Sequence, residues 1–126
     1  MSRSKIERRK YPRVEEKVPL KIKDEEFDAI TVSKNISCSG VFCQVEKVFP
    51  LLSKVKVVLL LPAESKTKAH PIYIDGVVVS SEPVKSASKP NCYNIAIFFS
   101  KIRRQDWSKI SNYINSILVK RMRIVH

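Results

Sequence analysis

Two short segments carry residue types suited to binding an anionic ligand, and the first of them is strongly basic. Residues 7–13 read Glu-Arg-Arg-Lys-Tyr-Pro-Arg and contain Arg8, Arg9 and Arg13. An arginine guanidinium can form bidentate hydrogen bonds with phosphate oxygens or with O6 and N7 of guanine, which a lysine ammonium cannot reproduce. Because proline favours an extended backbone before it, Arg9 and Arg13 can reach separate groups of one ligand.

The second segment, residues 35–40, reads Asn-Ile-Ser-Cys-Ser-Gly. The side-chain oxygen of Asn35 can accept a hydrogen bond from a guanine N–H group. Ser37 offers a hydroxyl either to a phosphate or to its own turn. We expect Gly40 to supply a backbone conformation with positive φ, or a close approach to the ligand.

Catalytic and metal-binding chemistry is poorly represented. The two histidines, His70 and His126, lie in a proline-flanked loop and at the end of the chain, without a CxxC or HxxxH pair. Phosphate-binding glycine motifs are also missing from the sequence. The acidic residues 24–28 are typical of a solvated turn. We therefore expect neither an enzyme nor a metal site.

The three cysteines, Cys38, Cys43 and Cys92, are an odd number, which argues against a disulfide framework. We expect them to be small core or near-core residues of a cytoplasmic protein, because a reducing compartment suits free thiols. The longest apolar run, residues 57–61, is far too short to cross a membrane. The basic N-terminus is not followed by an apolar stretch and does not resemble a secretory signal.

Composition indicates one folded domain with a strongly cationic surface. The chain has 126 residues, of which 44% are hydrophobic, and 24 lysines and arginines against 12 acidic residues give a formal charge of +12. Such a charge favours anionic partners without choosing among nucleic acid, nucleotides, acidic lipid and acidic protein. Residues 1–13 lack apolar periodicity and are expected to form a flexible arm, and residues 14–126 the folded domain.

Period-two hydrophobic patterns predict six short strands, typical of an antiparallel barrel or sandwich. Pro19 suggests that the first of them is an edge strand. Apolar residues then recur at helical spacing and predict an amphipathic helix over 103–120 that packs on the barrel. The expected strands cover residues 17–23, 27–34, 41–45, 55–61, 72–79 and 93–99. The helical stripe comprises Trp107, Ile110, Ile114, Ile117 and Leu118.

Taken together, the two polar segments resemble the RxxxR and (D/N)xSxxG signatures of the PilZ domain family. Arg9 and Arg13 match the first signature, which Arg8 extends, and the second is matched by Asn35, Ser37 and Gly40. Further stretches resemble the family's strands, and the similarity spans about residues 7–118. The additional stretches are residues 58–62, 75–78 and 94–99.

The resemblance implies an all-β fold, a six-stranded antiparallel β-barrel with a C-terminal helix, that binds the bacterial second messenger cyclic di-GMP. The arginines and the NxSxxG segment would clamp the dinucleotide, and the reshaped surface would signal to a partner protein. Ser39 and Ala96 stand where the family commonly has glycine. One alternative is an adaptor without ligand. Another is a basic nucleic-acid-binding barrel. The aromatic residues look core-facing, so no aromatic platform for stacking bases is evident, and this argues against nucleic-acid binding. Membrane binding through the basic helix end is a further possibility.

Overall fold

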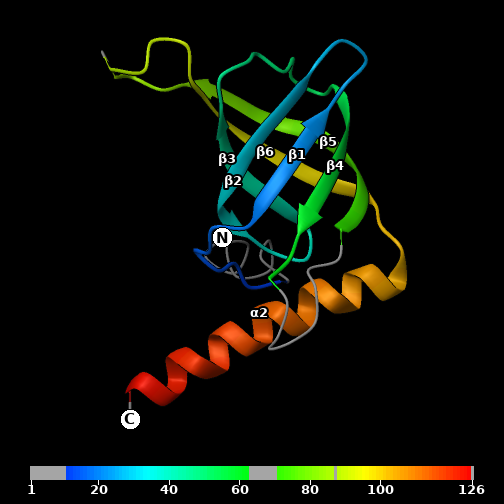
Figure 1. Cartoon of the computed structure of the whole chain (residues 1–126), viewed down its shortest axis with the longest axis vertical. Helices are drawn as coiled ribbons and strands as arrows, with labels where there is room; N and C mark the ends of the chain where they lie inside the picture. The colour runs from blue at the N-terminus through cyan, green and yellow to red at the C-terminus, as the bar shows by residue number, and fades with distance from the viewer. Residues whose placement is uncertain (1–10, 63–70, 87, 126) are drawn as a thin grey trace, which may run out of the picture.

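A computed structural model describes residues 11–62, 71–86 and 88–125 of the chain. In this part of the chain, six antiparallel strands form a closed barrel in the order β1-β2-β3-β6-β5-β4, and one helix, α2, crosses below it (Figure 1). The predicted six-stranded barrel with a C-terminal helix is confirmed. The elements are β1 (Pro19–Lys23), β2 (Asp28–Ile36), β3 (Gly40–Val45), β4 (Lys54–Leu60), β5 (Pro71–Pro83), β6 (Tyr93–Lys101) and α2 (Arg104–Val125).

The barrel interior is filled by the apolar residues that produced the period-two pattern. In β4, for example, Val55, Val57 and Leu59 are buried while the residues between them are more exposed. Alternate side chains of a strand point to opposite faces, so one face of each strand supplies the core. A closed barrel removes the free strand edges that would otherwise invite aggregation.

The prediction that Pro19 marks an edge strand is wrong. The strand β1 pairs with β2 on one side and with β4 on the other. Pro19 is the first residue of β1, and pairing with β4 begins only at Leu20. A proline at the first position of a strand needs no ladder hydrogen bond from its missing N–H, so it does not require a free edge.

Several elements are longer than the hydrophobic pattern predicts, and β5 and α2 exceed it most. The strand β5 continues to Pro83 because Ser81 and Glu82 still pair with β6, although the pairing register shifts between Val78 and Ser80. The helix α2 continues beyond the predicted end at residue 120, to Val125. In β5 and α2 the backbone hydrogen bonds continue past the last apolar residue that faces the core. Extending an element that has already formed does not require further contact with the core.

The helix covers one end of the barrel with the predicted face. Ile110 and Ile114 are fully buried, and Trp107, Ile117 and Leu118 pack partly buried against the same core. A second anchor lies in the first helical turn, where the buried carboxylate of Asp106 accepts a hydrogen bond from Arg103 Nε at 3.1 Å. Negative charge at this end of a helix is also favoured by the helix dipole.

The acidic segment 24–28 and the cysteines have the predicted structural roles. Asp24 Oδ1 accepts hydrogen bonds from the backbone N–H groups of Glu26 (2.8 Å) and Phe27 (2.9 Å), which makes a turn between β1 and β2. Cys38 and Cys43 are buried free thiols, and burial raises the pKa of Cys43 to about 12. Cys92 is also a free thiol and is half-buried.

Among the described residues, no group of three or more His, Cys, Asp and Glu side chains is arranged to hold a metal ion. His70 and His126 lie outside the described residues. No helix in the described ranges combines the length and apolar character needed to cross a membrane.

Ser33 ties the segment before β1 to the barrel. Its hydroxyl accepts a hydrogen bond from the Val18 N–H at 2.8 Å and donates one to the carbonyl of Glu16. Ser33 is only 1% exposed and Val18 is fully buried, so water cannot replace the bond between them. We expect Ser33→Ala to lower the free energy of unfolding by about 1–3 kcal/mol, the cost of leaving a buried N–H unpaired.

Urea unfolding measures this effect. The matched control is Ser100→Ala, since the Ser100 hydroxyl donates to the Asp75 carbonyl in an exposed position. That substitution should change the free energy of unfolding by less than about 0.5 kcal/mol. Equal losses for the two variants would show that the Ser33 hydrogen bonds do not anchor the segment.

Candidate ligand-binding site

The described end of the basic arm is hydrogen-bonded to the end of β2. The Val14 N–H donates to the Ile36 carbonyl at 3.0 Å, and the Ile36 N–H donates to the Val14 carbonyl at 3.0 Å. Both side chains are fully buried, so apolar packing reinforces this bridge. In antiparallel pairing, the residue before Val14 lies beside the residue after Ile36. The bridge therefore places Arg13 beside Ser37 and brings the two polar segments together.

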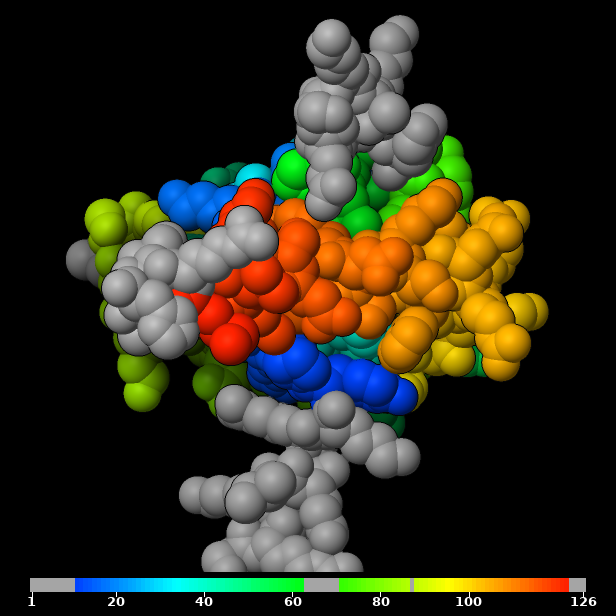
Figure 2. Space-filling view, turned by 90° about the horizontal axis from the view of Figure 1, so that it is seen from below, coloured from blue at the N-terminus to red at the C-terminus, as the bar shows by residue number. Residues whose placement is uncertain are grey.

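The same segment also contacts the helix. The Tyr11 ring meets the Trp107 ring edge-to-face, with centroids 5.8 Å apart, and Glu16 lies 3.9 Å from the Arg121 guanidinium. Figure 2 shows this described N-terminal segment, in blue, running alongside α2, in orange and red. The exposed side chain of Arg13 thus projects from a backbone held between β2 and α2. Arg8 and Arg9 lie outside the described residues.

A β-bulge in β2 sets the orientation of Asn35. The pairing with β3 shifts between Ser33 and Asn35, so Lys34 is the extra residue. Ser33 and Ile36 are both buried, while Lys34 is exposed and Asn35 is half-buried. Strict alternation from Ser33 would bury Asn35 and expose Ile36. The bulge reverses this, since it turns Lys34 and Asn35 outward together and keeps Ile36 in the core.

The serine-rich turn after β2 is held by its own hydrogen bonds. The Ser37 N–H donates to the Gly40 carbonyl at 2.9 Å, and Ser37 Oγ accepts from the Ser39 N–H at 3.1 Å. Ser37 Oγ also lies 3.0 Å from Ser39 Oγ. Of the two roles expected for the buried Ser37 hydroxyl, this structure shows the bond within its own turn, which fixes the shape of the loop.

Gly40 is required for a close approach between strands and not for an unusual backbone angle. The expected positive φ is wrong, since neither described glycine has one. A Cβ atom at Gly40 would lie 2.5 Å from the backbone oxygen of Ile97 in β6. The adjacent Ser39 carbonyl also accepts the Phe99 N–H at 2.9 Å. The close approach is therefore to a neighbouring strand, and it locks the turn onto β6.

Three residues that motif matching missed surround Asn35. Lys34 Nζ donates to Asn94 Oδ1 at 3.1 Å and lies 6.0 Å from the centre of the Phe42 ring. Phe42 is directly opposite Asn35 across the β2–β3 pair. The alternation in β3 does place Phe42 on the outer face, but nothing in the sequence pairs it with Asn35. The bulge creates this corner of amide, ammonium and aromatic groups.

The expectation that the aromatic residues face the core needs correction. Phe42 is half-buried on the outer face, and Tyr73 and Phe98 are exposed large hydrophobic residues. Tyr73 and Phe98 occupy outward positions of β5 and β6, where a regular solvated barrel would carry polar side chains. The barrel surface therefore offers aromatic contacts that the sequence argument against nucleic-acid binding had excluded.

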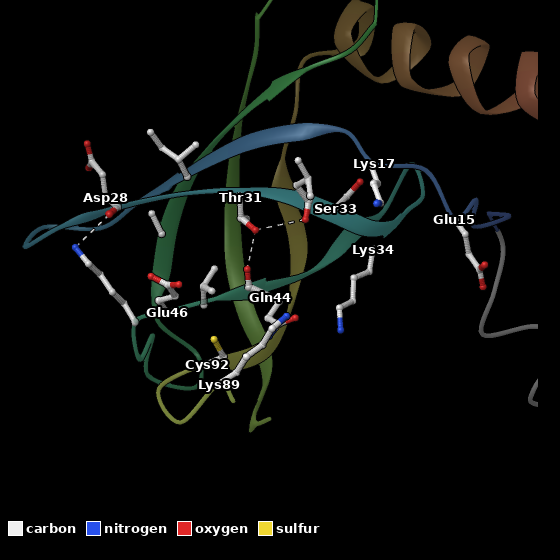
Figure 3. Close-up of a pocket in the computed structure, with 15 residues that line it drawn as sticks. Glu15, Lys17, Asp28, Thr31, Ser33, Lys34, Gln44, Glu46, Lys89 and Cys92 are labelled. Atoms are coloured by element: carbon white, nitrogen blue, oxygen red, sulfur yellow. Dashed lines mark hydrogen bonds between the residues drawn. The ribbon is translucent and has the colours of Figure 1, made fainter. Parts of the chain in front are cut away.

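A groove of about 920 Å³ adjoins the corner formed by Lys34 and Asn35. The groove opens on the N-terminal side of Ser33, where β2 is no longer paired with β3. The Thr31 hydroxyl bridges this opening by donating to the Gln44 carbonyl at 2.7 Å (Figure 3). The groove includes Ser33 and Lys34 but not Arg13, Asn35, Ser37 or Gly40. Its charged lining residues are Glu15, Lys17, Asp28, Lys34, Glu46, Lys47 and Lys89.

A closed barrel with a basic segment bridged to a structured polar turn is an arrangement suited to ligand binding. The PilZ domain family model matches residues 7–116, and the chain belongs to this family. Members are non-enzymatic binding or adaptor proteins, so this chain is not an enzyme. The family binds cyclic di-GMP. None of the curated proteins matches the sequence.

Two solved structures share the fold. The inhibitor of motility MotI/DgrA from Bacillus subtilis has 23% sequence identity and a TM-score of 0.76 over 90% of this chain. The PilZ domain of YcgR from Escherichia coli, solved with c-di-GMP, has 12% identity and a TM-score of 0.64 over 92% of this chain and 95% of its own. The chain spans about half, 53%, of the Bacillus subtilis protein.

Proposed function

We propose that this chain is a cyclic di-GMP receptor that acts as an adaptor, without catalysis of its own. One observation carries the proposal: the Val14–Ile36 bridge holds the end of the RxxxR segment against the NxSxxG turn. The two segments are separated by about twenty residues in the sequence, and packing of the barrel alone does not require the basic residues. Their juxtaposition creates a polar corner with a guanidinium beside it, suited to a phosphate-bearing guanine ligand.

The residues divide into those that contact the ligand and those that shape the site. The guanidinium groups of Arg8, Arg9 and Arg13 bind phosphate oxygens or guanine edges, and Asn35 accepts from a guanine N–H group. Ser37 and Gly40 hold the turn in shape. Support for this division comes from the hydrogen bonds within the turn and from the close approach of Gly40 to β6.

Signalling then depends on a partner protein. The arm, residues 1–13, contacts the domain, residues 14–126, at Tyr11, which packs on Trp107, and on binding its arginines close over the ligand. The ordered arm and the ligand present a new surface to a downstream protein in the bacterial cytoplasm. The thiols, all free in the described residues, suit that reducing compartment.

Calorimetric titration with cyclic di-GMP at physiological salt tests the proposal, with GTP as the control. We expect selective binding with micromolar or tighter affinity. An absence of heat, together with no displacement of a fluorescent cyclic di-GMP analogue, would overturn ligand binding and favour the ligand-free adaptor. Oligonucleotide binding that persists at physiological salt would instead favour the nucleic-acid alternative, because non-specific phosphate attraction falls steeply with salt.

A further inference from the structure

The outer face of β1, β4 and β5, together with Ile30 of β2, carries exposed apolar side chains that are unusual for a solvated sheet. On the exposed face of an antiparallel sheet, outward side chains are ordinarily polar. Here Ile30 is 82% exposed and Tyr73 68% exposed, and Leu60 is exposed as well. Together with Val58 they line a shallow groove of about 690 Å³, which we call the β1–β4 groove.

Strand register places three of these residues, Ile30, Val58 and Tyr73, in one row with Lys21. Ile30 is opposite Lys21, Lys21 is opposite Val58, and Val58 is opposite Tyr73. Neighbouring strands are about 4.8 Å apart, so the row of four residues spans about 14 Å. That length matches roughly nine or ten residues of an α-helix at about 1.5 Å per residue. The strands β1 and β4 lie side by side on the barrel face turned toward the viewer in Figure 1.

The groove is bordered by three lysines, Lys21, Lys23 and Lys56. Lys23 and Lys56 stand directly opposite each other across β1 and β4. Like charges in this position destabilise a sheet. Lys56 is paired with Asp75 at 2.6 Å, whereas Lys21 is paired with Asp28 at 3.0 Å. The groove lining itself carries three lysines against the single carboxylate of Asp75. An anionic partner would relieve the repulsion between the opposed lysines.

The charge and the closed barrel restrict the type of partner. A second copy of the chain also carries +12, so electrostatic repulsion opposes self-association through a lysine-bordered face. The strands under the groove, β1 and β4, are each paired on both sides, which leaves no strand edge there for an added β-strand. Exposed apolar side chains with lysines among and beside them fit an amphipathic helix whose apolar face contacts Ile30, Val58 and Tyr73 and whose acidic residues meet the lysines.

From this geometry we infer that the β1–β4 groove is a docking site for an acidic amphipathic helix of a partner protein. The corner residues Lys34 and Asn35 lie at the far end of β2 from Ile30, and neither lines the β1–β4 groove. Phe42 and Asn94 lie on β3 and β6, across the barrel from β4 and β1. Ligand and helix can therefore occupy the domain together. The inference supplies a partner class for the proposed adaptor function, and to that extent it rests on it.

Amide chemical shifts in an NMR titration of the full chain test the docking site. The probe is a synthetic capped peptide of leucine and glutamate with helical periodicity, and its control replaces every glutamate with lysine. We expect saturable shifts concentrated in β1, β4 and β5 with the acidic peptide alone. The absence of saturable binding, or equal binding of the lysine peptide, would overturn the inference.

Variants identify the surface. Ile30→Ser combined with Tyr73→Ser should weaken binding of the acidic peptide at least tenfold, and Lys23→Glu should weaken it several-fold. The matched control is Met122→Ser, because Met122 is 63% exposed on α2 and does not line the groove. Its affinity for the peptide should equal that of the unmodified protein. If the double variant binds like the control, the groove is not the site.

Three further measurements separate the possible failures. Circular dichroism melting should show the double variant folded, since both side chains are largely exposed. Sedimentation that reveals a dimer of the unmodified protein, dispersed by the same double substitution, would assign the face to self-association and overturn the helix assignment. Cyclic di-GMP titration of the double variant should remain unchanged, so loss of peptide binding with retained ligand binding isolates the docking site from the proposed receptor function.

Discussion

Replacing Arg13 with alanine should weaken cyclic di-GMP binding by about tenfold to a hundredfold, because a hydrogen bond to a charged group contributes about 1.5–3 kcal/mol. Arg13 is the signature arginine whose backbone the structure describes, immediately before the Val14–Ile36 bridge. Its exposed side chain extends from an anchored backbone, so little binding energy is spent on positioning that backbone. The measurement is the calorimetric dissociation constant of the variant.

Two control substitutions separate charge, geometry and folding. Arg13→Lys keeps the charge and loses the planar fork, so it should recover only part of the affinity. Arg104→Ala removes an exposed arginine at the start of α2 and should leave the isotherm unchanged. Because Arg13 is exposed, its substitution should leave the thermal midpoint almost unaltered. An unchanged isotherm for Arg13→Ala, with the same midpoint, would contradict the assignment of the site.

Arg9→Ala provides the companion test of the RxxxR signature. Arg9 lies outside the described residues, and its role comes from the sequence signature alone. We place it with Arg13 in one ligand-binding unit, so their double substitution should cost less than the sum of the two single losses if both arginines contact the same phosphate. Additive losses would instead indicate that the two guanidinium groups bind separate parts of the dinucleotide.

Much of the barrel could be predicted from sequence because its interior is apolar and its strands are short. The alternation of Val55, Val57 and Leu59 with exposed residues specifies which face of β4 points inward, and the other strands repeat this logic. The same argument predicts the helical stripe around Ile110 and Ile114. These patterns record burial, which is what hydrophobic periodicity measures.

Features made by backbone hydrogen bonding were harder to predict. The end of β5 is polar, and Ser81 pairs with Ile95 through main-chain groups that every residue possesses. The closure of the barrel places β1 between β2 and β4, although Pro19 suggested an edge. A proline at the first position of a strand inside a closed barrel and a proline on an edge strand leave the same pattern of side chains. The sequence therefore does not distinguish the two.

The candidate site illustrates both cases. Asn35, Ser37 and Gly40 lie within six residues of one another, so their closeness at the connection from β2 to β3 follows from the chain itself. Their role in ligand binding stays a prediction. The bulge at Lys34 could not be predicted, because an added residue in a strand changes the facing of the following residues without any change in composition. The environment of Asn35, including Phe42 across the strand pair, follows from that bulge.

The role of Gly40 also depends on its neighbours in space, and it leads to a stability prediction. Gly40→Ala should lower the free energy of unfolding by about 1–3 kcal/mol or more, the usual cost of forcing extra atoms into a packed region. The added Cβ would lie 2.5 Å from the Ile97 carbonyl oxygen. This oxygen belongs to the backbone of β6, so the strands must separate to relieve the contact. Urea unfolding measures the loss.

Gly76→Ala is the matched control for this argument. Its nearest obstacle is the Cγ2 methyl of the buried, β-branched Ile97 side chain, 2.6 Å from the new Cβ. That side chain can shift only by local repacking of the core, which still disturbs the barrel less than moving a backbone oxygen of a paired strand. The Phe98 carbonyl oxygen at 3.2 Å adds a milder contact, so a smaller loss of stability is expected. If Gly76→Ala proves equally costly, general crowding around Ile97 explains both results. If Gly40→Ala alone is severe and also weakens cyclic di-GMP binding in the fraction still folded, then strand contact at Gly40 positions the turn that carries Ser37.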